Sequence, residues 1–180
     1  LTSFGMKDDV NSFPKIFKSE ASGIVTKWMP GQGWNMIEGS EFSGNNGLVI
    51  IDGVEPLYIA SWGTGTLEIL EGGISQSVDL GDWRPDNIRL APDGDLILAG
   101  QVSSADDLFS KCLTVAVKIC GVDYRVVKVN PKTYEVEVLV DETGSEHFGG
   151  ASAAIIVGDE VWVGPQKRKI PGQLADRFNI

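Results

Sequence analysis

A unit of strand, turn and strand recurs along this chain, and this recurrence constrains the fold more than any other feature of the sequence. Each copy has two runs rich in apolar and β-branched residues, joined by a turn that contains Gly and Asp, which is the pattern of a β-hairpin. The copies span residues 46–61, 84–100 and 150–164. The matching residues Asn46 and Asn87 are about 41 positions apart, a spacing in the range of propeller repeats.

Two of these copies extend into four consecutive short strands. Four strands joined in one meander form the blade of a β-propeller. The first four are expected at 47–51, 57–61, 66–70 and 76–80, and the second four at 87–91, 95–100, 124–130 and 134–140. A hairpin formed by 22–29 and 34–38 precedes them, and further strands follow residue 149. The sequence therefore predicts an all-β fold, in which residues 1–180 form one partial β-propeller domain of four-stranded blades, about half of a six-bladed ring.

Residues 102–122 interrupt the second set of four strands. Apolar residues at helical spacing predict a helix over 108–118, and the polar segment 104–107 is typical of a helix cap. Because the first strand leaves one face of the propeller and the second returns to it, we expect this helical insertion on the channel face, either as surface decoration or as a pocket wall. The only cysteines, Cys112 and Cys120, are expected to be buried thiols.

The acidic composition argues against one class of partner. The chain has 180 residues, of which 42% are apolar and 22% charged, the balance of a globular domain. A formal net charge of -10 argues against nucleic acid, because phosphate binding needs clustered Lys and Arg and the one dense basic run, 167–169, is short. No apolar run approaches the ~20 residues of a membrane span, so we expect no membrane partner.

Oxygen-bearing side chains stand at the start of the innermost strand of each unit. They are Asn46, Asp86 with Asn87, and Ser152. In a propeller these strands begin beside the central channel, so their first residues are expected to converge on its axis. Carboxylate and amide oxygens are ligands of calcium, whereas zinc and copper prefer imidazole and thiolate. The alternative is that these residues only begin strands and satisfy turn amides, as Asn and Asp often do.

The same motifs, in this order and spacing, resemble the second half of a known superfamily over about residues 40–170. This is the six-bladed calcium-dependent propeller superfamily of paraoxonase and arylesterase, gluconolactonase (regucalcin) and strictosidine synthase. The motifs that carry the resemblance are Asn46–Leu48 with Leu57–Ala60, Pro85–Ile88 with Asp93–Leu96, and Gly150–Ser152 with Glu160–Gly164. The resemblance implies that Asn46, Asp86 and Asn87 are ligands of a calcium ion in the channel.

The implied activity is metal-assisted hydrolysis of a lactone or ester. Calcium would polarise the carbonyl oxygen of the substrate and stabilise the oxyanion formed when water attacks. Asp86 is the first candidate for accepting the proton of that water, and His147, the only histidine, is a second candidate base. Two alternatives stay open. One is a noncatalytic propeller module that binds a partner or ligand through its channel face, and the other is a strictosidine synthase-like relative with Glu146 facing the channel.

The remaining calcium ligands of the family have no counterpart in this sequence. They are a Glu near the N-terminus and an Asn in a middle blade. Two explanations are open. Either the chain is a fragment that lacks the N-terminal blades, or two copies pair about a two-fold axis and complete the ring as a homodimer. In the homodimer, Asn46, Asp86 and Asn87 of both copies would offer two carboxylates and four amides to one ion.

Overall fold

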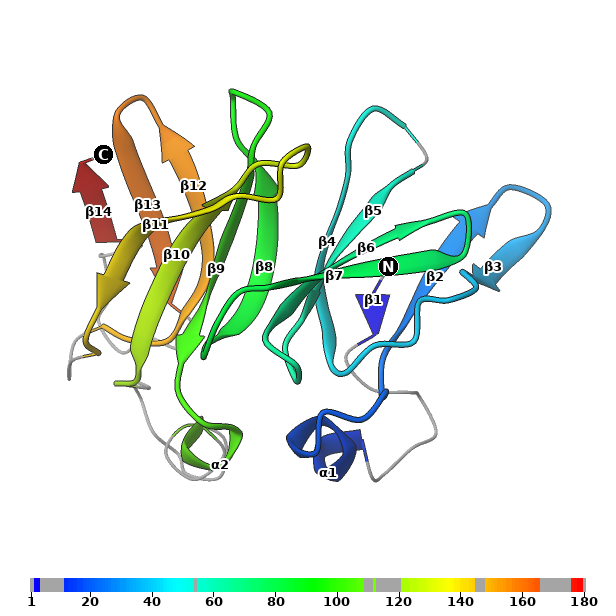
Figure 1. Ribbon diagram of the computed structural model, residues 1–180, viewed down its shortest axis with the longest axis horizontal. Coiled ribbons are helices and arrows are strands. Elements are labelled where there is room, and N and C mark those ends of the chain that lie inside the picture. Colours follow the sequence, from blue (N-terminus) through cyan, green and yellow to red (C-terminus); the bar gives the residue numbers. More distant parts are fainter. Residues whose placement is uncertain are drawn as a thin grey trace. The chain divides into compact units, whose positions relative to one another are not determined.

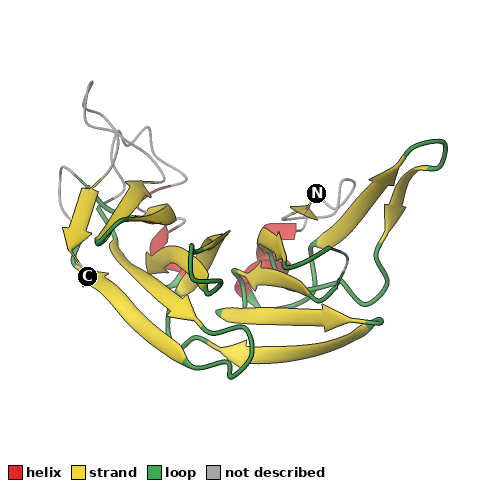
Figure 2. Cartoon of the chain, turned by 90° about the horizontal axis from the view of Figure 1, so that it is seen from above, coloured by secondary structure: helices red, strands yellow, loops and turns green. Residues whose placement is uncertain are grey.

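The computed structural model describes residues 2–3, 12–53, 55–108, 112, 121–144, 148–165 and 176–179 (Figure 1). Strands dominate these residues and the helices are short (Figure 2). The all-β fold class is therefore confirmed. Among the described residues, no helix has the length and apolar character needed to cross a bilayer. The chain divides into two compact units, residues 1–81 and residues 82–180.

The first unit contains two antiparallel sheets (Figure 1). One has three strands in the order β1-β2-β3, and the other is a four-stranded meander in the order β4-β5-β6-β7. The elements are β1 (Thr2–Ser3), α1 (Ser12–Phe17), β2 (Ile24–Met29), β3 (Gly33–Met36), β4 (Asn45–Ile50), β5 (Leu57–Ser61), β6 (Thr66–Glu71) and β7 (Ile74–Asp79). The meander confirms the first predicted set of four strands.

The two sheets of this unit share one apolar core. Val25 on β2 packs with Leu57 and Ile59 on β5 and with Leu70 on β6, and these side chains are at most 2% exposed. Burial of apolar side chains between two sheets is the main force that holds such a unit together. The short helix α1, in which Ile16 is 1% exposed, was not predicted, because a six-residue segment is too short for its apolar residues to stand out as a period.

The second unit repeats this arrangement with a four-stranded and a three-stranded antiparallel sheet. The meander has the order β11-β10-β9-β8 and the smaller sheet the order β12-β13-β14. The elements are β8 (Arg84–Leu90), β9 (Leu96–Val102), α2 (Ala105–Leu108), β10 (Asp123–Val129), β11 (Val136–Glu142), β12 (Ala151–Val157), β13 (Glu160–Pro165) and β14 (Asp176–Asn179). This meander confirms the second predicted set of four strands.

Strand β12 packs against β8 and β9, so the two sheets of the second unit lie face to face. Their shared core includes Ala99 on β9, Val126 on β10, Ala154 on β12 and Val161 on β13. Near this core the ring of Tyr124 meets that of Phe148 edge-on, with 5.0 Å between the centroids. The face-to-face packing matters for function because it brings the start of β12 beside the start of β8.

The turn between β8 and β9 has the geometry that its residues favour. The backbone N–H of Gly94 donates to Ala91 O at 3.0 Å, and Gly94 has a φ of 93°, which an L side chain rarely adopts. Asp93 Oδ1 accepts a hydrogen bond from the N–H of Asp95 at 3.1 Å. This hairpin sets the register of β8 against β9.

Residues 102–108, 112 and 121–122 of the insertion are described, and most of the helix predicted over 108–118 lies outside the described residues. A helix α2 begins earlier than predicted, at Ala105 within the expected cap segment, and Ser104 caps it, since its Oγ accepts a hydrogen bond from the N–H of Asp107 at 3.1 Å. Cys112 is buried and disulfide-bonded, so the expectation of a free thiol at this position was wrong. A spacing of eight residues does not by itself distinguish buried thiols from a bridge.

Candidate functional site

The strands β4, β8 and β12 each carry a β-bulge at the position that the sequence singles out. On β4 the regular pairing breaks between Asn45 and Leu48, which places Asn46 in the irregular step. On β8 the break lies between Pro85 and Asn87, and on β12 between Ala151 and Ala153. Asp86 and Ser152 are therefore the extra residues of their strands. A bulge bends the strand and redirects a side chain, which is why bulges are frequent beside binding sites.

Asp86 is a buried carboxylate at the start of β8. Its side chain is 7% exposed. Its Oδ1 accepts a hydrogen bond from Asn87 Nδ2 at 2.9 Å, and its Oδ2 accepts one from Gln101 Nε2 at 3.2 Å. Two amide donors thus hold both oxygens of the carboxylate in place.

Asn87 links Asp86 to the neighbouring sheet. Its Nδ2 donates to the backbone oxygen of Ser152 at 2.9 Å and lies 3.3 Å from Ser152 Oγ. Because the amide nitrogen faces Asp86 and Ser152, the amide oxygen is the atom of Asn87 that is directed away from them. Three of the four predicted positions, Asp86, Asn87 and Ser152, are therefore in one cluster of oxygen-bearing side chains.

Gln101 is a member of this cluster that the sequence did not reveal. It lies on β9, its side chain is 0% exposed, and its Nε2 donates to Ala151 O at 2.6 Å as well as to Asp86. It therefore connects the bulged segments of β8 and β12. A polar residue late in an apolar strand was the only local signal, and nothing in the sequence indicated its partners.

Arg84 precedes the cluster on the same strand. It is half-buried, and desolvation lowers the pKa of its guanidinium. An arginine stays cationic at neutral pH even so.

Asn46 lies in the first unit and is half-buried at the start of β4. Its neighbour Asn45 is 1% exposed and donates through Nδ2 to Ser40 O at 2.8 Å. The Oδ1 atom of Asn45 is buried and has no hydrogen-bond partner among the described residues. Asn45 therefore ties the start of β4 to the segment that precedes it. His147 and Glu146, the other two candidates, lie outside the described residues.

The cluster offers hard oxygen donors rather than a dense set of carboxylates. Within the described ranges, no three side chains of the types His, Cys, Asp or Glu are grouped so that they could hold a metal ion. The donors at Asp86, Asn87 and Ser152 are one carboxylate, one amide and one hydroxyl. This chemistry suits calcium, which accepts neutral oxygens beside a carboxylate. Comparison with protein-family models and with curated proteins found no match for this chain.

Proposed function

We propose that this chain is about half of a six-bladed calcium-dependent β-propeller, and that it hydrolyses a lactone or an ester at the channel end of β8. The observation that carries the proposal is the bulged Asp86–Asn87 pair. Its carboxylate is buried, both of its oxygens are held by amide donors, and the Asn87 nitrogen is tied to Ser152 on the next sheet.

Each residue of the cluster has a role in this mechanism. A bound calcium ion would polarise the substrate carbonyl and stabilise negative charge on its oxygen. Gln101 and Ser152 hold Asp86 and Asn87 in fixed rotamers, so that their oxygens are preorganised. Asp86 accepts a proton from the attacking water through a carboxylate oxygen.

The outer face of the last sheet supports the idea that further blades or a second copy complete the ring. In the second unit, Ala154 and Ile156 turn toward the shared core, whereas Ile155 and Val157 on the same strand are 45% and 46% exposed. Apolar side chains on an uncovered sheet face are typical of a surface that another sheet covers. Light scattering that gives the mass of a strict monomer would exclude the homodimer.

Calcium titration followed by thermal melting tests the metal site. A ligand present at a hundred times its Kd stabilises the folded state by about 2.7 kcal/mol, which corresponds to a rise in Tm of roughly 5–10 °C for a chain of this size. Asp86→Asn removes the charge without changing the shape, and we expect it to abolish the rise. Asp159→Asn, at an exposed turn position, is the control and should keep the rise.

Two results would contradict the proposal. A wild-type protein whose Tm does not respond to calcium would favour the noncatalytic module. Calcium-dependent stabilisation that survives in Asp86→Asn would place the ion elsewhere. If calcium binds, hydrolysis of a phenyl ester and of a simple lactone should follow calcium occupancy, and Asp86→Asn should lower kcat/KM by about 100-fold or more.

A further inference from the structure

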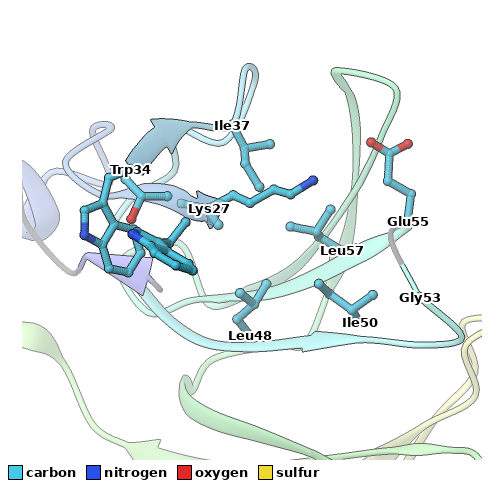
Figure 3. A pocket seen from close by; sticks show the side chains of 11 residues that line it. Lys27, Trp34, Ile37, Leu48, Ile50, Gly53, Glu55 and Leu57 are labelled. Carbon is cyan, nitrogen blue, oxygen red and sulfur yellow. The ribbon is translucent and has the colours of Figure 1, made fainter. Parts of the chain in front are cut away.

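The first unit holds a pocket that the proposed calcium site does not use. It has a volume of about 580 Å³ and lies between the β2–β3 hairpin and the strands β4 and β5 (Figure 3). Cavities of roughly 300–1,000 Å³ are typical of sites that bind small organic molecules. The described residues that line it belong to the first unit.

One side of the pocket is apolar and open to water. Leu48, Ile50 and Leu57 line this side, and Ile50 is 42% exposed (Figure 3). At one end lies Trp34, which is 61% exposed and stands directly opposite Trp28 on the paired strand. An exposed indole beside a concave aliphatic surface favours a flat apolar ligand, because covering both removes apolar area from water.

Two charged side chains border this apolar surface. Lys27 extends across the pocket, and Glu55 lies at the end away from Trp34 (Figure 3). Glu55 Oε2 accepts a hydrogen bond from the N–H of Gly72 at 2.9 Å, which holds this carboxylate at its end of the pocket. The Lys27 ammonium makes no hydrogen bond or ion pair with any described residue. An ammonium group above an apolar surface is complementary to an anionic group on an otherwise apolar ligand.

We propose that this pocket binds a flat organic monoanion, namely an aromatic carboxylate or sulfonate. The aromatic ring lies against Trp34 and the aliphatic side formed by Leu48 and Leu57, and the anionic group meets the ammonium of Lys27. The carboxylate of Glu55 repels a second negative group at the far end, which restricts the ligand to a single charge. This proposal stands independently of the calcium site and of any hydrolase activity.

Titration with 2-naphthoate tests the proposal. Isothermal titration calorimetry should give one site per chain, and the indole N–H signals of Trp28 and Trp34 should shift in NMR spectra. We expect Lys27→Gln to weaken 2-naphthoate binding by about tenfold, because it removes one charge-assisted hydrogen bond. Naphthalene-2-carboxamide, which has the same rings but no charge, should bind the wild type and Lys27→Gln equally.

Matched variants separate loss of the ligand contact from loss of the fold. Lys27 is exposed, so Lys27→Gln should melt at the wild-type temperature, and Lys27→Arg should retain binding. Lys18→Gln changes an exposed lysine of the same unit that does not line the pocket, and it should bind 2-naphthoate like the wild type. Trp34→Ala should weaken binding of both the anion and the neutral amide.

Several results would overturn the proposal. They are the absence of saturable binding, equal binding of 2-naphthoate by Lys27→Gln and wild type, and full affinity in Trp34→Ala. Sedimentation measurements add another: if the protein forms a dimer that 2-naphthoate dissociates, the pocket is an interface with a second copy rather than a site for a small anion.

Discussion

Replacing Gln101 by Leu tests how the candidate site holds Asp86. The amide nitrogen of Gln101 lies 2.6 Å from Ala151 O and 3.2 Å from Asp86 Oδ2, and the side chain is 0% exposed. Leucine fills a similar volume but donates no hydrogen bond, so two buried acceptors lose a donor. An unsatisfied buried acceptor costs about 1–3 kcal/mol, and more when it is charged. We expect the free energy of unfolding of the second unit to fall by about 3–5 kcal/mol.

Urea unfolding measures this loss. Trp83 in the second unit is 1% exposed and Trp62 in the first unit is 6% exposed, so tryptophan fluorescence follows the unfolding of both units, and circular dichroism follows the strands of the whole chain. Gln76→Leu makes the same substitution at an exposed position of β7, and it should change the free energy of unfolding by less than about 0.5 kcal/mol. A loss below about 1 kcal/mol for Gln101→Leu, with an unchanged m-value, would refute the reasoning, because it would mean that the two acceptors need no donor from Gln101.

Two further predictions concern packing and charge in the second unit. A Cβ at Gly100 would clash with Arg84 O, whereas one at Gly164, also opposite a bulge, would meet only a carbonyl oxygen at 3.7 Å. In urea unfolding, Gly100→Ala should therefore cost about 3 kcal/mol or more and Gly164→Ala less than about 0.5 kcal/mol, and equal costs would contradict this contrast. Glu137, which hydrogen-bonds Lys128, raises the pKa of that lysine above 10.5. A lysine whose pKa is higher in the folded than in the unfolded state stabilises the fold at pH values below its unfolded-state pKa, and this stabilisation is lost as the pH rises through its folded-state pKa. Lys128→Met should therefore lower Tm at neutral pH and lower it by a smaller amount near pH ~11.

The strands and their order follow from local features of the sequence. Short runs rich in apolar and β-branched residues, separated by turns with Gly and Asp, predict both meanders. Such side chains favour buried strands, and a tight turn needs residues that tolerate its backbone angles. The start of β8 was also predicted as a functional position, since Asp86 and Asn87 form a carboxylate–amide pair at the first residues of an inner strand.

The assembly of the site depends on contacts that no local pattern encodes. Gln101 meets Asp86 across 15 residues of sequence and Ala151 across 50, and Asn87 meets Ser152 across 65. These hydrogen bonds exist only because β8 pairs with β9 in one register and because β12 packs on both strands. The sequence therefore specifies which side chains stand at the strand ends. The bulges and the packing of one sheet on the other decide which of them meet, because both depend on the burial of apolar faces far apart along the chain.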